Sequence, residues 1–135
     1  MITKQINSIK NKYHISDEVL AHILNISISE LNEISNNKQL LHDIEQNGKN
    51  IQSALLMLDE GISMIPSDER LHGVIDDLIN LYLLSPETIC LYGEISEKNF
   101  NLYYYKNKEI DVNMKFDFSV KIFMLFAMIK RDMVL

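Results

Sequence analysis

Apolar side chains recur along most of the chain at spacings of three and four residues, as at Ile6, Ile9 and Tyr13. This spacing places them on one face of a helix, and no sustained alternation of apolar and polar residues competes with it. The pattern therefore predicts an all-α protein. Serines just before such runs can accept a hydrogen bond from a free amide in the first helical turn. They predict at least five short helices, starting after Ser16, Ser27, Ser67, Ser85 and Ser96.

The helical pattern occurs twice, as an internal sequence repeat. Residues 6–34 and 75–103 share eight identical positions at an offset of 69 residues, where chance would supply roughly two. A repeat of this size predicts two small domains. The paired residues are Ile6 and Ile75, Asn11 and Asn80, Tyr13 and Tyr82, Ser16 and Ser85, Glu18 and Glu87, Ile26 and Ile95, Ser27 and Ser96, and Asn32 and Asn101.

The segment around Pro66 marks the expected boundary between the domains. A residue that precedes proline resists the helical conformation, and Ser67 could cap the helix that follows. We therefore expect domains at residues 1–66 and 67–135.

Each repeat contains the pattern of a helix-turn-helix. In the first, Ser16 caps a helix that carries the small residue Ala21, and Asn25 tolerates the left-handed backbone of a tight turn. Ser27 then caps a second helix, and Ile26 fills the angle between the two. In the second repeat Cys90 stands at the position of Ala21, where a small buried side chain suits the helix crossing, and Glu94 occupies the turn position.

These residues resemble the phage-repressor-like (Cro and Xre type) DNA-binding domains across about 20 residues of each repeat. The resemblance implies two tandem lambda-repressor-like bundles of about five short helices each, and a DNA-binding transcriptional regulator. It implies that residues early in each second helix contact double-stranded DNA. Base contacts would fall to Ile28, Ser29 and Glu33, with Asn32 near a phosphate, and in the second repeat to Glu97, Lys98 and Leu102.

Charge favours the second repeat as the DNA-binding one. The first recognition helix has Glu30 and Glu33 but no lysine or arginine, and Asp17 stands where the family often has glutamine. Because phosphate neutralisation supplies most non-specific affinity, this helix is a poor DNA binder. Residues 98–108 instead contain three lysines and no acid, interleaved with tyrosines that could bond phosphates or stack. The expected contacts are Ser29, Asn32, Lys98, Asn99, Asn101, Tyr104, Lys106 and Lys108.

Two other interpretations stay open for these residues. Tyr103, which matches the apolar Ile34, can belong to the core, and lysines near a helix end can be a solvated cap favoured by the dipole. A helix-turn-helix bundle can also serve as a protein-interaction adaptor or anti-repressor after its basic surface is lost.

The carboxyl-terminal segment is apolar around nearly its whole circumference, so we expect a helix that is buried on several sides. In phage-repressor-like proteins the final helix commonly forms the dimer contact. The resemblance therefore implies either packing between the two final helices of one chain or a homodimer through residues 118–130.

Composition excludes several classes of function. Thirteen basic against nineteen acidic residues give a net charge of −6, so any DNA contact must be local. The single cysteine excludes an internal disulfide, and the scattered histidines, the absence of a glycine-rich phosphate loop and the lack of a nucleophile elbow argue against an enzyme, metal or cofactor. No apolar run reaches the roughly 20 residues of a bilayer span and no secretion signal is present, so we expect a cytoplasmic protein.

Overall fold

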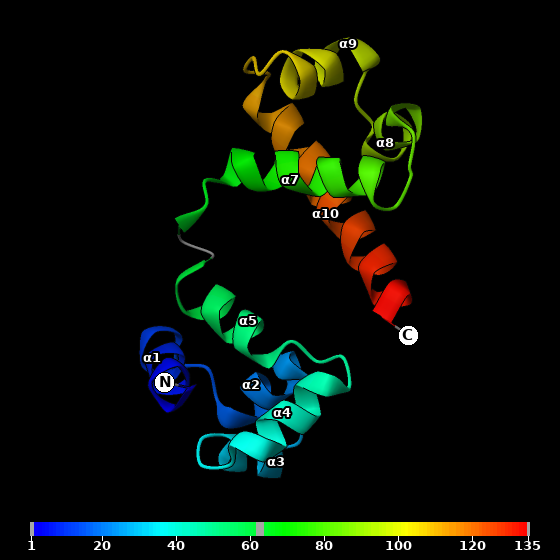
Figure 1. Ribbon diagram of the computed structural model, residues 1–135. Helices are drawn as coiled ribbons and strands as arrows, with labels where there is room; N and C mark the ends of the chain where they lie inside the picture. The colour runs from blue at the N-terminus through cyan, green and yellow to red at the C-terminus, as the bar shows by residue number, and fades with distance from the viewer. Residues whose placement is uncertain (1, 62–63, 135) are drawn as a thin grey trace. The chain divides into compact units, whose positions relative to one another are not determined.

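The computed structural model of the protein describes residues 2–61 and 64–134, with the side chains of the last helix described as far as Lys130. Within these residues all regular structure is helical, which confirms the all-α prediction. The chain divides into two compact units, Met1–Ile65 and Pro66–Leu135 (Figure 1). No helix in the described ranges is long and apolar enough to cross a membrane.

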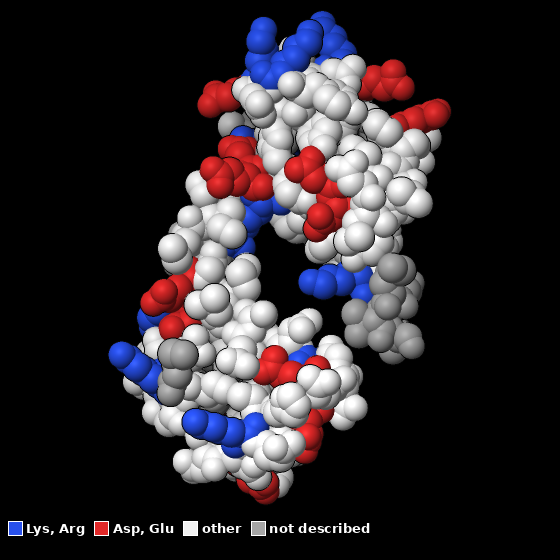
Figure 2. All heavy atoms as spheres, viewed as in Figure 1, with Lys and Arg blue, Asp and Glu red and all other residues white. Residues whose placement is uncertain are grey.

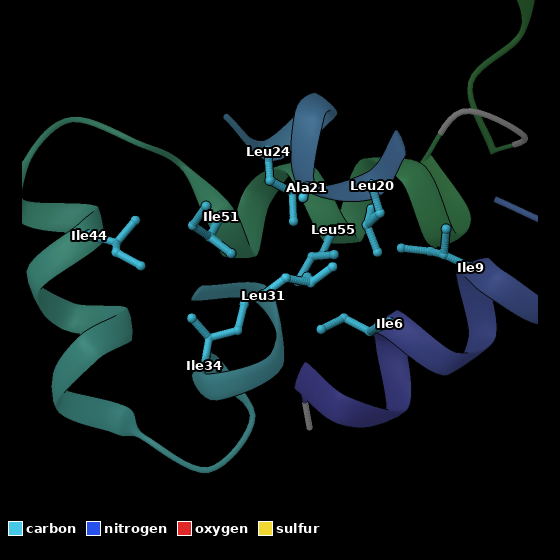
Figure 3. Packing of buried hydrophobic residues seen from close by; sticks show 10 residues of the cluster. All are labelled: Ile6, Ile9, Leu20, Ala21, Leu24, Leu31, Ile34, Ile44, Ile51 and Leu55. Carbon is cyan, nitrogen blue, oxygen red and sulfur yellow. The ribbon is translucent and has the colours of Figure 1, made fainter. Parts of the chain in front are cut away.

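Unit 1, Met1–Ile65, is a bundle of short helices around one apolar core. Its second and third helices form the predicted helix-turn-helix, and its first helix packs against the last. Figure 3 shows the buried side chains of every helix pointing into a common interior. The elements are α1 (Ile2–Tyr13), α2 (Asp17–Leu24), α3 (Ile28–Ile34), α4 (Lys38–Gln46), α5 (Ile51–Leu56) and the π-helical turn η1 (Met57–Gly61).

A buried aspartate joins the two ends of unit 1. Asp59 in η1 accepts hydrogen bonds from Ser8 Oγ at 2.6 Å and from Lys12 Nζ at 2.9 Å, both from α1. The same ammonium also donates to the Asp59 carbonyl oxygen at 2.9 Å. These hydrogen bonds hold the pKa of the Asp59 carboxyl below its usual value, because they favour the charged form. A charge buried this way is tolerated only while its partners stay in place.

Unit 2, Pro66–Leu135, differs from the five short helices that the sequence predicts. Its third helix runs directly into a π-helical turn, and the segment that would match α4 is part of a loop and of one long final helix. That final helix packs on both the first and second helices of the unit. The elements are α7 (Ser67–Asn80), α8 (Pro86–Gly93), α9 (Glu97–Phe100), η2 (Asn101–Tyr105) and α10 (Val112–Val134).

The final helix α10 is not buried on several sides, so that expectation is wrong. Phe118 and Ile122 lie in the core at no more than 1% exposure. On the other face Phe116 and Met124 are more than half exposed, because unit 2 supplies neighbours for only one side of this helix. An apolar surface is therefore left uncovered within unit 2. A groove of about 370 Å³ between α7 and α10 includes Phe116 and continues this surface.

Four of the five predicted caps are confirmed and one is wrong. Ser16, Ser27, Ser85 and Ser96 each accept a hydrogen bond from the backbone N–H three residues later. Ser67 is instead the first residue of α7. Pro66 precedes it with the extended backbone of a cap residue and provides no side-chain hydrogen bond, so the first amides of α7 have no capping hydroxyl.

Candidate nucleic-acid interface

The first helix-turn-helix is built by local hydrogen bonds at both helix starts. Ser16 accepts from Val19 N–H at 3.2 Å and opens α2, and Asn25 ends α2 in the left-handed region at φ 56°. Ser27 and Glu30 then form a reciprocal capping box at the start of α3. In it, Ser27 Oγ accepts from Glu30 N–H at 3.0 Å while the Glu30 carboxylate accepts from Ser27 N–H at 2.9 Å.

The second helix-turn-helix uses the same devices at the matching positions. Ser85 caps α8, Ser96 caps α9, and Glu94 adopts φ 53° at the turn. Gly93, one residue earlier, is the last residue of α8 and is buried. A Cβ on Gly93 would lie 2.4 Å from Phe118 Cδ1, so the glycine is required by helix packing and not by the turn. Cys90 is buried in the core as predicted, and desolvation raises the pKa of its thiol.

The exposed face of α3 is acidic. Ser29 and Asn32 lie on the surface as the sequence predicts, but Ser29 Oγ donates to a Glu33 carboxylate oxygen at 3.4 Å. The capping hydrogen bond lowers the pKa of Glu30, so this side chain is negative at neutral pH. At the start of α2, Asp17 pairs with Lys10 at 2.7 Å. A phosphate backbone approaching α3 would therefore meet carboxylates without a compensating lysine on that helix.

The corresponding surface of unit 2 is basic. Lys98 lies in α9, Lys106 follows η2, and Lys108 lies two residues further on, all three exposed. In the described part of the chain none of these lysines belongs to an ion pair. Figure 2 shows Lys and Arg side chains gathered at the α9 end of unit 2, with acidic side chains only beside them. Three free ammonium groups on one end of a small unit can neutralise phosphates.

The three consecutive tyrosines that follow α9 have different environments. Tyr103 is buried, as the interpretation of it as a core residue predicts, and its hydroxyl donates to Asp68 Oδ1 at 2.7 Å. Tyr104 is half-buried, and its hydroxyl donates to Asp76. Tyr105 is 58% exposed. Burial, and then the neighbouring carboxylates, raise the pKa of Tyr103 and of Tyr104 above the ordinary tyrosine value.

The structure thus brings the predicted contacts of unit 2 together on α9, η2 and the loop after it. Asn101 is exposed, Asn99 is half-buried, and Tyr104 uses its hydroxyl within the unit. Sequence reasoning missed the partners of the tyrosines. Asp68, His72 and Asp76 follow each other at four-residue spacing on α7, so they line one face of that helix, and this spacing was the available signal.

Among the described residues, no group of three or more histidine, cysteine or carboxylate side chains could hold a metal ion. A cavity of about 230 Å³ does lie beside the basic surface. Both acidic and basic side chains line it, among them Asp68, Glu109, Lys108 and Lys115.

The paired short helices, the left-handed turns between them and the exposed second helices define a helix-turn-helix protein. A family model described as a helix-turn-helix domain matches residues 1–134, and the chain belongs to that family. Membership of such a family points to a DNA-binding regulator in general. A single model runs across both units. No curated protein and no solved structure matches the chain significantly.

Proposed function

We propose that the chain is a transcriptional regulator whose DNA contact is made mainly by unit 2. The observation that carries this proposal is the contrast between α3 and the segment that runs from α9 through η2 into the loop after it. Lys98, Lys106 and Lys108 are exposed and unpaired in the described structure, whereas α3 presents Glu30 and Glu33. Asn99 and Asn101 would add hydrogen bonds to phosphates or base edges. Tyr104 would not donate to DNA, because its hydroxyl already donates a hydrogen bond to Asp76.

We further propose that the two units are tandem copies of one phage-repressor-like module. Support comes from the agreement of caps and turns at the 69-residue offset: Ser16 with Ser85, Asn25 with Glu94, and Ser27 with Ser96. The second copy would have gained the π-helical turn and lost the separate fourth helix. In this proposal unit 1 keeps the helix-turn-helix fold without a basic surface, while unit 2 keeps the surface that binds phosphates.

A homodimer through residues 118–130 is the proposed assembly. Val120, Phe123, Met124 and Met128 are each at least 39% exposed on the outer face of α10. Large apolar side chains that lie together on a surface often mark an interface. Two DNA-binding units joined in this way could occupy two half-sites.

DNA binding can be tested by titrating a labelled random-sequence duplex at low salt. We expect binding that weakens steeply with added salt, and the combined substitution Lys106→Glu and Lys108→Glu should reduce the salt slope by about two. The matched control is Lys4→Glu with Lys38→Glu, which makes the same charge change at exposed lysines of unit 1. Equal loss in both variants would show only a net-charge effect, and no binding by the natural sequence would refute the proposal.

The second candidate is a protein-interaction adaptor or anti-repressor, and the acidic face of α3 favours it. With Ser29 bonded to Glu33 and Asp17 paired to Lys10, the first recognition helix offers an approaching phosphate no free cation. If the natural chain fails to bind duplex at low salt, and Lys98→Glu changes nothing, the adaptor becomes the better explanation.

A further inference from the structure

The π-helical turn η2 is held to α7 by two tyrosine hydroxyls. Tyr103 donates to Asp68 and Tyr104 donates to Asp76, so two consecutive side chains bond carboxylates on one helix. In an α-helix adjacent side chains diverge by about 100°. The wider π turn, with its extra residue, lets both tyrosines reach α7. The matching segment of unit 1, residues 32–36, has no tyrosine, and α3 ends within it at Ile34.

The imidazole of His72 fills the space between these two contacts. Its ring centroid lies 4.7 Å from that of Tyr103 and 5.6 Å from that of Tyr104. The Tyr104 ring also stacks on that of Phe100 in α9, with 5.3 Å between the ring centroids. Lys115 of α10 also reaches Asp68, at 3.2 Å. The aromatic contacts and the two carboxylates together fix the position of η2 against α7.

The backbone of η2 in turn holds two lysines of the basic surface. The Lys106 N–H donates to the Asn101 carbonyl at 3.1 Å, and the Lys108 N–H donates to the Leu102 carbonyl at 2.9 Å. Asn107 between them adopts φ 51°. Both lysines are therefore tied to the first residues of the π turn through their own amides. A shift of η2 on α7 would move them together.

We propose that Asp68 and Asp76 are positioning residues for DNA binding, acting through Tyr103 and Tyr104 on the backbone that carries Lys106 and Lys108. The inference rests on the proposed function of this surface. Neither aspartate touches DNA, since a carboxylate would repel phosphate. Their role is to keep η2 in the π-helical form, so that the lysines meet successive phosphates without reordering.

The test uses Tyr104→Phe, which removes one hydroxyl and keeps the stacked ring, in the full chain. The matched control is Tyr105→Phe, because the adjacent Tyr105 is exposed and no hydrogen bond is found for its hydroxyl in the described structure. We expect native-state hydrogen exchange of the Lys106 and Lys108 amides to rise about fivefold in Tyr104→Phe and to stay unchanged in Tyr105→Phe. The Ile122 amide in α10 should not change in either variant.

Exchange needs no DNA, so it tests the positioning role even if the chain does not bind duplex. Unchanged exchange at Lys106 and Lys108 would overturn the proposal, and so would an equal rise at Ile122, which would indicate general destabilisation. In DNA titrations Tyr104→Phe should weaken binding about fivefold in the natural background and have no effect when Lys106 and Lys108 are both alanine. An equal loss in both backgrounds would show that Tyr104 acts by a route other than these lysines.

Discussion

Gly93 and Phe118 lie so close that the last turn of α8 has no room for a side chain against α10. A Cβ at position 93 would be 2.4 Å from Phe118 Cδ1 and 2.6 Å from Cε1. Gly93→Ala should therefore destabilise unit 2 by about 1–3 kcal/mol, since the core must shift to accept one methyl group. Chemical denaturation measures this loss.

The control is Gly73→Ala in α7, where no atom lies within 4 Å of the new Cβ. That substitution should raise helix stability by about 0.5–1 kcal/mol, and equal effects at the two positions would contradict the packing explanation.

Substitution by alanine should lower the free energy of unfolding more at a capping serine than at Ser67. Ser27→Ala removes the hydroxyl of the capping box and should destabilise unit 1 by about 1 kcal/mol. Ser67→Ala should have little effect, because Ser67 is already inside α7 and caps no amide. Thermal or urea unfolding of the two variants compares them directly, and a large loss at Ser67 would contradict the helix start seen in the structure.

Asp59 should make unit 1 sensitive to acid. Its folded pKa lies below the unfolded value of about 3.8, so its contribution is fully present above that pH and is lost as the pH falls through the folded pKa. Asp59→Asn should lower the free energy of unfolding at neutral pH and flatten its fall below about pH 4. Urea titrations across this range provide the measurement. The matched control is Glu18→Gln, which removes one carboxylate charge at an exposed position of the same unit.

The outer face of α10 should control the oligomeric state. Phe123 is 39% exposed and Met124 57%. If this face forms a homodimer through residues 118–130, sedimentation should give twice the 15.7 kDa chain mass, and Phe123→Glu with Met124→Glu should give the monomer. Leu83→Glu is the control, since Leu83 is 82% exposed but lies outside α10. A natural chain that remains monomeric at about 100 μM would be inconsistent with an interface of standard size.

The alkylation rate of the single thiol, Cys90, should measure how often unit 2 opens. Cys90 is buried and its thiol pKa is raised by desolvation, so both access and thiolate fraction are low. Alkylation of the native protein should be far slower than in urea, and Gly93→Ala should accelerate it by opening unit 2 more often. Rapid native labelling at neutral pH would contradict the buried position.

The sequence predicts the parts of the fold that local chemistry determines. Ser27 and Asn25 carry their signal within a few residues, because a hydroxyl caps an amide three positions away and asparagine tolerates a left-handed turn. Ser67 shows the limit of this reasoning, since Pro66 takes the cap position by its own backbone geometry. The helix begins one residue earlier than the hydroxyl suggests.

The candidate site was predictable only where charged residues cluster within one short segment of the sequence. The lysines between positions 98 and 108 are visible in the sequence, whereas Asp68, His72 and Asp76 appear only as a four-residue spacing that does not say what they contact. Asp68 is 35 residues from Tyr103, and Asp76 is 28 residues from Tyr104. A π-helical turn that depends on such distant contacts has no local signal. The exposed side of α10 likewise depends on which neighbours the fold supplies.

Each unit closes its own apolar interior, from Ile6 to Leu55 in one and from Leu71 to Ile122 in the other. In each cluster the buried side chains pack on residues of their own unit. Substitutions in the interior of one unit therefore leave the packing partners of the other interior unchanged, so the acidic face of α3 can change without altering the core that supports the lysines of unit 2.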